Sequence, residues 1–204
     1  LKFSSFKKLI LTLITILFST AIFAGLAPDE VIRKTADDVI SALKSDEVIR
    51  NGNKKKLYQL AEEKILPNFD FERISRLVLG KAWRKATDLQ KKQFKIEFRT
   101  LLLRTYSIAL SKYKDQGIEI KPMRMKPADE IVIVKTEIVQ GGAQPIKVNY
   151  ALAKDADSWL VFDIVIEGVS LVTNYRSQFS SVIRSGGMDS LNKRLAKKNK
   201  SNKD

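Results

Sequence analysis

The sequence predicts an α+β fold, in which N-terminal helices and a C-terminal helix pack on a curved four-stranded antiparallel meander sheet. Apolar residues recur at helical spacing through the first half of the chain, and a period of two replaces that spacing from Ile118 onward. The alternating stretches follow one another through short turns, as in a meander, and a last helical stretch begins near Asn174. Helices gathered before such a sheet indicate α+β rather than alternating α/β.

Residues 1–24 have the pattern of a secretory signal peptide. The opening LKFSSFKK contains three lysines and no acid, and an apolar run from Leu9 to about Phe23 follows it. Fifteen helical residues span about 22 Å, which is shorter than the roughly 30 Å hydrocarbon core, so a signal peptide is favoured over a membrane anchor. We expect cleavage after Ala24, or as late as Ala27, and export to a bacterial periplasm.

Four helices are expected before the sheet. The first begins at Pro28 and ends by Asn51-Gly52, and the second runs from Lys54 to Ile65, before Pro67. Asp70 is suited to cap a third helix that ends at Gly80. The fourth and longest opens with the capping-box pattern Thr87 to Gln90 and has a broad apolar face from Phe94 to Tyr113.

Four alternating stretches predict the strands: IEIKPMRMK, DEIVIVKTEIVQ, QPIKVNYALAKD and SWLVFDIVIEGVSLV. In the last of them, one apolar face is expected from Leu160, Phe162, Ile164 and Ile166. The closing helix carries a Ser185-Gly-Gly187 interruption. We therefore expect one domain over residues 28–195, followed by a basic disordered tail at 196–204.

The composition excludes several classes of site. The chain has no histidine and no cysteine, which removes the common nucleophile and base pairs and the zinc or copper clusters. Carboxylate chemistry is left, with Asp163 and Glu167 as candidates. Four residues along a strand separate them by roughly 13 Å, beyond the range of a glycosidase pair. Each acid is favoured as a partner of a nearby lysine or arginine at the sheet margin, although either could act as a lone general base.

The formal net charge of +14 predicts attraction to anionic surfaces. No nucleic-acid motif accompanies it, and an anionic membrane or lipid headgroup fits an exported protein better. One basic run flanks the start of the long helix and predicts a docking patch for an acidic partner: Lys81, Arg84, Lys85, Lys91 and Lys92.

Several long motifs carry a family resemblance: EGVSLVTNYRSQF with IRSGGMDSL, and ILPNFDFERISRLVLGKAWRKAT with FRTLLLRTYSIAL. The chain resembles the MlaC family, the periplasmic phospholipid carriers of the outer-membrane lipid-asymmetry pathway, also known as toluene-tolerance proteins. The resemblance implies a nuclear-transport-factor-like or cystatin-like fold with acyl chains between sheet and helices. It also implies a protein that is not an enzyme, needs no cofactor or metal, and exchanges lipid with an inner-membrane Mla transporter and an outer-membrane lipoprotein-porin complex. The lysine-rich tail departs from the family pattern.

A lipid pocket is then expected between the long helix and the sheet. Its predicted lining is Phe98, Leu102, Tyr106, Ile133, Val148, Tyr150, Phe162, Ile164 and Ile166, with a mouth at Val169, Leu171, Tyr175 and Phe179. Arg176 could bind a lipid phosphate or form a salt bridge with Glu167. Two alternatives stay open: a small-molecule isomerase or hydratase of the same general fold using Asp163 or Glu167, and a peripheral membrane protein held by its basic tail.

Overall fold

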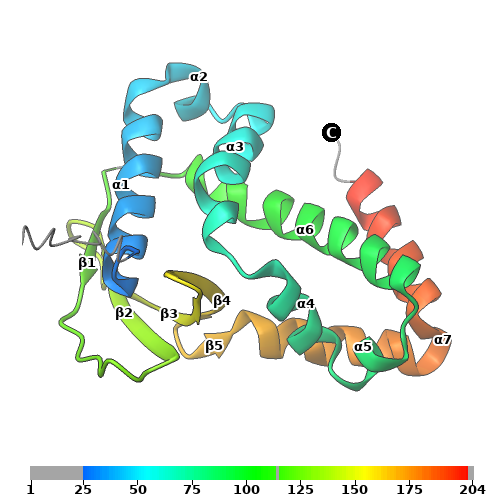
Figure 1. Ribbon diagram of the computed structural model, residues 1–204. Helices are drawn as coiled ribbons and strands as arrows, with labels where there is room; N and C mark the ends of the chain where they lie inside the picture. Colours follow the sequence, from blue (N-terminus) through cyan, green and yellow to red (C-terminus); the bar gives the residue numbers. More distant parts are fainter. Residues whose placement is uncertain (1–24, 114, 202–204) are drawn as a thin grey trace, which may run out of the picture.

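The computed structural model describes residues 25–113 and 115–201, and it confirms the predicted α+β class. In Figure 1 the sheet and α1 (Pro28–Ser45) lie on one side of the molecule, and the long helices α6 and α7 extend away from them on the other. The predicted signal peptide, residues 1–24, lies outside the described residues. No helix among the described residues is both long enough and apolar enough to cross a membrane.

The predicted first helix is two helices. α1 ends at Ser45, and the side chain of Asp46 accepts hydrogen bonds from the backbone N–H groups of Val48 and Ile49. That cap starts the short α2 (Glu47–Arg50) at an angle to α1. Asn53 caps α3 (Lys54–Leu60) in the same way, through the backbone N–H of Lys56.

Irregular helical turns connect α3 to the next helix. The predicted helix from Lys54 to Ile65 widens into a π-helical segment, η1 (Ala61–Ile65), and then tightens into a 3₁₀ turn, η2 (Leu66–Asn68). Pro67 has no N–H to donate, which prevents regular helix from continuing. Asp70 caps α4 (Phe71–Leu79) through the backbone N–H of Arg73, as predicted, and Gly80 separates α4 from α5 (Lys81–Lys85).

The long helix α6 (Asp88–Leu110) begins with the predicted capping box. The Thr87 hydroxyl accepts from the Gln90 N–H at 3.2 Å, and the Gln90 side chain accepts from the Thr87 N–H at 3.0 Å. Its side chains Phe94, Phe98 and Leu101 are buried against α4 and α7.

The sheet has five strands in the order β1-β2-β3-β4-β5, all antiparallel. They are β1 (Gly117–Ile120), β2 (Ile131–Val139), β3 (Ile146–Asp155), β4 (Ser158–Ile166) and β5 (Val169–Ser170). The predicted last strand is interrupted because Glu167 and Gly168 both adopt positive φ, 47° and 83°. Two such residues make a tight hairpin turn, and β5 pairs back on β4.

A bulge in β4 corrects the predicted face of that strand. Ala151 pairs with Asp163 and Leu152 pairs with Val161, which leaves Phe162 without a partner on β3. The alternation therefore shifts, and Val161 and Ile164 contact the same core cluster. Phe162 instead packs against the cluster of α4, α6 and α7, with the Arg73 guanidinium 4.7 Å from its ring centroid.

The C-terminal helix α7 (Leu171–Ser201) is kinked at Gly187, where φ is 73°, close to the predicted interruption. Beyond the kink it packs along α6: the Asn192 amide donates to the Gln90 carbonyl at 3.1 Å, and the Asn199 amide donates to the Glu97 carbonyl at 2.9 Å. The prediction of a disordered tail from residue 196 is therefore wrong as far as Ser201. Leu195 and Asn199 are buried, so this segment is helical and packed, and residues 202–204 lie outside the description.

Candidate functional site

An apolar cavity of about 350 Å³ lies where the sheet, α1, η1, η2 and α6 meet. The helices contribute the larger part of its wall: Ile32, Thr35, Ala36 and Val39 from α1, Ala61, Ile65, Leu66 and Asn68 from the irregular turns, and Leu102, Leu103, Tyr106, Ser107 and Leu110 from α6. The sheet contributes Tyr150, Val161, Ile164 and Ile166, and Phe69, Phe71 and Leu171 complete the wall.

Few polar atoms line this cavity, and most of them are paired with each other or with the backbone. The Thr35 hydroxyl donates to the Val31 carbonyl at 2.7 Å and accepts from the Asn68 amide at 2.8 Å. The Ser107 hydroxyl donates to the Leu103 carbonyl. Burial raises the pKa of the Tyr150 phenol, which keeps it neutral. Among the described residues that line this cavity there is no carboxylate and no cation, so its surface is suited to hydrocarbon.

Local contacts hold the irregular wall in place. Phe69 forms an isolated parallel bridge with Val161, and the Asp70 N–H donates to the Val161 carbonyl at 3.0 Å. The Asn68 amide also donates to the Lys64 carbonyl. The turn before α4 is therefore tied to β4, and this places Phe69 and Phe71 at the border of the cavity.

Six predicted lipid-binding residues lie in the cavity wall: Leu102, Tyr106, Tyr150, Ile164, Ile166 and Leu171. Ile133 and Val169 do not line it, and their exposed fractions are 55% and 56%. Ile133 lies on the outer face of β2 because its neighbours Val132 and Val134 are buried on the inner face. Val148 is buried in the sheet, where it pairs with Thr136 and Ile166.

The predicted residues Phe98, Tyr175 and Phe179 belong to a closed aromatic cluster, together with Phe71 and Phe94. The Phe98 ring centroid lies 5.1 Å from that of Tyr175 and 5.4 Å from that of Phe179. Burial, and then a hydrogen bond with Tyr106, raises the pKa of the Tyr175 phenol. Tyr175 and Phe179, expected at a mouth, are instead 7% and 6% exposed, because they pack inside this aromatic cluster.

Arg176 lies on the surface beside Gly80. A carbon added at Gly80 would lie 3.0 Å from Arg176 Nη2, so the guanidinium packs over that glycine. The alternative of a salt bridge to Glu167 is not found among the ion pairs of the described residues. Glu167 instead accepts from the Lys147 N–H.

Asp163 has a structural role at the start of α7. Its carboxylate accepts from the Ser170 hydroxyl at 2.6 Å and from the Val172 N–H at 3.1 Å. Ser170 in turn accepts from the Thr173 N–H at 3.0 Å. Neither Asp163 nor Glu167 lines the apolar cavity, which disfavours the isomerase or hydratase alternative.

The predicted docking patch occupies α5 and the start of α6. Lys81, Arg84, Lys85 and Lys92 are exposed, while Lys91 is partly buried. Lys91 pairs with Asp88 at 3.2 Å and lies 5.5 Å from the Trp83 ring centroid. The structure gathers these cations on one surface, and their role in docking stays a prediction.

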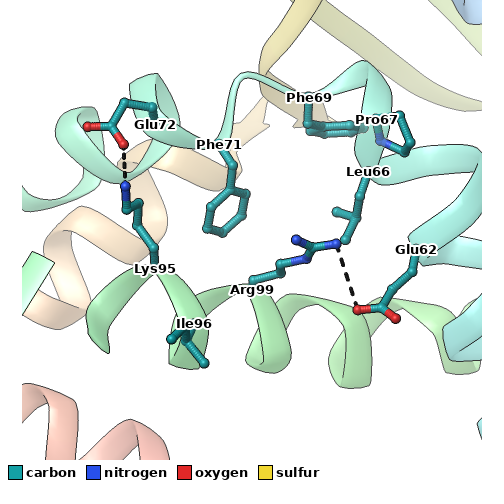
Figure 2. Close-up of a pocket in the computed structure, with 9 residues that line it drawn as sticks. All are labelled: Glu62, Leu66, Pro67, Phe69, Phe71, Glu72, Lys95, Ile96 and Arg99. Atoms are coloured by element: carbon teal, nitrogen blue, oxygen red, sulfur yellow. Dashed lines mark hydrogen bonds and ion pairs between the residues drawn. The ribbon is translucent and has the colours of Figure 1, made fainter. Parts of the chain in front are cut away.

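A second cavity, of about 480 Å³, adjoins the first and was not predicted (Figure 2). Leu66, Phe69 and Phe71 line both cavities, whereas Glu62, Glu72, Lys95 and Arg99 line the second alone. The apolar cavity was expected near or above the upper end of the roughly 300 to 1,000 Å³ usual for ligand sites. Its volume of about 350 Å³ lies instead near the lower end of that range.

The family comparison agrees with this arrangement. A protein-family model described as MlaC protein matches residues 33–197. The chain belongs to the MlaC family. The resemblance found in the sequence is thereby confirmed, and the match covers most of α1, every element from α2 to β5, and most of α7.

Individual relatives carry the same names. The toluene tolerance protein ttg2D of Pseudomonas putida is 25% identical over 168 residues, covering 81% of this chain and 77% of the relative. The intermembrane phospholipid transport system binding protein MlaC of Haemophilus influenzae is 23% identical over 189 residues, covering 91% of this chain and 88% of that one. A phospholipid-binding protein from Ralstonia solanacearum, solved in complex with a phospholipid, has a TM-score of 0.80 and 34% identity, and covers 86% of this chain and 98% of its own.

Sequence reasoning missed the contribution of α1 and of the irregular turns to the MlaC cavity. A usable signal was present in α1, where Ile32, Thr35, Ala36 and Val39 follow helical spacing with small residues among them. The π-helical and 3₁₀ turns have no comparable pattern, apart from the proline that ends them.

Proposed function

We propose that the protein is a periplasmic phospholipid carrier whose apolar cavity holds acyl chains. In this proposal it moves lipid between an outer-membrane lipoprotein-porin complex and an inner-membrane Mla transporter, which maintains outer-membrane lipid asymmetry. The observation that carries the proposal is the cavity between sheet and helices, whose wall, as formed by the described residues, is apolar and without a charged side chain. The phospholipid complex of the Ralstonia solanacearum protein supports it.

The free energy of the lipid in water explains why a carrier is needed. A diacyl lipid with about thirty methylenes, at about 0.8 kcal/mol each, costs roughly 24 kcal/mol to place in water. A cavity that matches the apolar interior of a bilayer removes most of that cost. Transfer between membrane and carrier can then be nearly balanced, and docking decides where lipid is taken up or released. The carrier itself needs no nucleotide or cofactor.

The basic surface of α5 and α6 supports docking to acidic partners. Lys81, Arg84, Lys85 and Lys92 point into solvent, where their charges can steer association. We propose that this surface meets the membrane complexes. Replacing these three lysines and one arginine with glutamine should slow lipid delivery to either complex, most clearly at low salt, while bound lipid stays unchanged.

The decisive test measures bound lipid in protein from cells without detergent, by native mass spectrometry followed by solvent extraction. We expect a mass excess of roughly one phospholipid. Ile164→Lys places a charge in the cavity wall and should abolish the excess. Ile133→Lys is the matched control, because Ile133 lies on the outer face of the sheet and is 55% exposed. Ala36→Phe fills the cavity with apolar atoms and provides a second variant that should fold without lipid.

An empty protein that also takes up no lipid from vesicles would contradict the proposal. Equal loss of lipid in Ile133→Lys and Ile164→Lys, with both variants folded by circular dichroism, would likewise place the ligand outside this cavity.

A further inference from the structure

One face of α6 changes from charged to apolar along its length. Lys95 and Arg99 line the second cavity, which we call the polar cavity because it contains the charged side chains Glu62, Glu72, Lys95 and Arg99. Leu102, Leu103, Tyr106 and Leu110 continue along the apolar cavity. At about 1.5 Å per residue, the segment from Arg99 to Leu110 is about 16 Å long. The two cavities therefore present a polar end and an apolar end along a single helix, as an amphiphile does.

Three residues form the border between the cavities. Leu66, Phe69 and Phe71 line both of them. In Figure 2 the Phe71 ring and the Leu66 side chain point toward α6, with the Arg99 guanidinium between Leu66 and Glu62. These shared residues therefore stand between the two cavities.

The polar cavity holds two cations and two carboxylates. Lys95 Nζ lies 2.6 Å from Glu72 Oε2, and Arg99 Nη2 lies 3.7 Å from Glu62 Oε1. All four side chains are about a third to a half exposed. Water therefore screens the attraction within both ion pairs, and each pair is weak. A ligand with an anion and a cation of its own could exchange with these pairs at little cost.

We propose that the polar cavity is a headgroup site for a zwitterionic phospholipid. This inference rests on the proposed function, since the acyl chains of the same lipid would occupy the apolar cavity. Arg99 and Lys95 would bind the phosphodiester, which guanidinium suits by its paired N–H donors. Glu62 and Glu72 would accept hydrogen bonds from the headgroup ammonium. The ligand class is a phosphoethanolamine lipid, in preference to one with a neutral alcohol on the phosphate.

The test offers mixed vesicles to lipid-free protein. The vesicles contain phosphatidylethanolamine, phosphatidylglycerol and diacylglycerol with identical acyl chains, and mass spectrometry measures the bound ratios. Glu62→Gln with Glu72→Gln should lower the ratio of bound phosphatidylethanolamine to phosphatidylglycerol about threefold, as expected for partly exposed charge pairs. Lys95→Gln with Arg99→Gln should lower both phospholipids relative to diacylglycerol.

The matched control removes a comparable ion pair elsewhere. Arg33 and Glu30 form a pair at 3.5 Å with 49% and 53% exposure, close to the 47% and 50% of Arg99 and Glu62. Glu30→Gln with Arg33→Gln should leave all ratios unchanged. Water-soluble glycerophosphoethanolamine, at the concentration of the lipid, should not displace bound lipid. Displacement would assign the cavity to a free phosphodiester and overturn the inference.

The two proposals fail differently. If all three lipids bind and their ratios are the same in every variant, the headgroup inference is wrong and the carrier function stands. If no lipid binds to the unaltered protein, the carrier proposal is wrong, and the headgroup site falls with it.

Discussion

The two halves of α6 have opposite surroundings. In the N-terminal half, Phe94 and Phe98 are at most 1% exposed and pack against α4 and α7. In the C-terminal half, Leu102, Leu103 and Tyr106 border a cavity. Both halves show the same apolar spacing in the sequence, yet the apolar face of the first packs against aromatic rings and that of the second borders the apolar cavity.

The tight packing of the N-terminal half of α6 helps to explain how the C-terminal half can border a cavity. A cavity leaves its lining without contacts on one side, which costs stability. The aromatic cluster offsets this, because Phe98 alone stacks or tilts against four rings, those of Phe71, Phe94, Tyr175 and Phe179. Each such pair contributes about 0.5 to 1.5 kcal/mol beyond its buried area. We infer that folding stability and ligand binding are assigned to different halves of one helix.

The largest expected effect on stability comes from truncating one side chain in the N-terminal half of α6, compared with one in the C-terminal half. Phe98→Ala should lower the free energy of unfolding by about 3 to 5 kcal/mol, because it removes a buried ring from the centre of the cluster. Leu102→Ala should cost less than the roughly 2 to 5 kcal/mol of a fully buried leucine, since that side chain already borders a cavity. Urea denaturation measures both. Equal losses would contradict the division of roles.

Local signals predicted much of this fold. The cap at Asp70 and the capping box from Thr87 to Gln90 each join residues that are at most four positions apart. The interruption near Gly187 depends on the glycine itself. Such short-range features can be found in the sequence. The bulge at Phe162 could not be found, because it depends on how β3 pairs with β4. Nor could the packed helix beyond residue 196, where the Asn199 amide donates to the Glu97 carbonyl of α6 about one hundred residues away.

Substitution of the glycine between α4 and α5 should have the next largest effect on stability. Gly80 has φ of 54° and ψ of −121°, which side-chain-bearing residues rarely adopt, and the Arg176 guanidinium covers it. Gly80→Ala should cost about 1 to 3 kcal/mol in unfolding free energy. Gly141→Ala is the control, because a carbon added there meets nothing within 4 Å. Restoration of stability by adding Arg176→Ala would show that the contact, and not the backbone, is responsible.

The site was less predictable than the fold. A stripe of apolar residues has the same spacing whether it packs against a neighbour or faces a cavity, which is why Phe98 and Phe179 were assigned to the pocket and Ile32 and Val39 were not. Ile133 was placed on the wrong face because β2 is apolar at successive positions, from Ile131 to Val134. The polar cavity cannot be predicted from local spacing, because Glu62, Glu72 and Arg99 come from three separate elements that only the fold brings together.

A smaller effect is expected where the two regions join. Asp163→Asn should destabilise the protein by about 1 kcal/mol, because it weakens the acceptors for Ser170 and Val172 at the start of α7. Bound lipid should stay the same, since Asp163 does not line the cavity. Thermal unfolding and lipid extraction measure the two quantities. Loss of lipid without loss of stability would give Asp163 a direct role in binding.

The smallest effect is confined to alkaline pH and concerns Tyr175, which lies in the aromatic cluster beside Tyr106. Burial raises its pKa in the folded protein, so the neutral phenol is favoured there and the unfolded chain ionises first. The contribution of Tyr175 to stability is therefore complete below about pH 10 and decreases as pH rises further, by less than about 1 kcal/mol at pH 10.5. Tyr175→Phe should flatten the decline of urea midpoint between pH 9 and 10.5. Because Tyr150 is also buried in the cavity wall and its pKa is raised, Tyr150→Phe should flatten part of the decline as well. If the urea midpoint declined equally with pH in Tyr175→Phe and in the unaltered protein, water would reach the phenol. The aromatic cluster around Phe98 would then open more readily than its packing indicates.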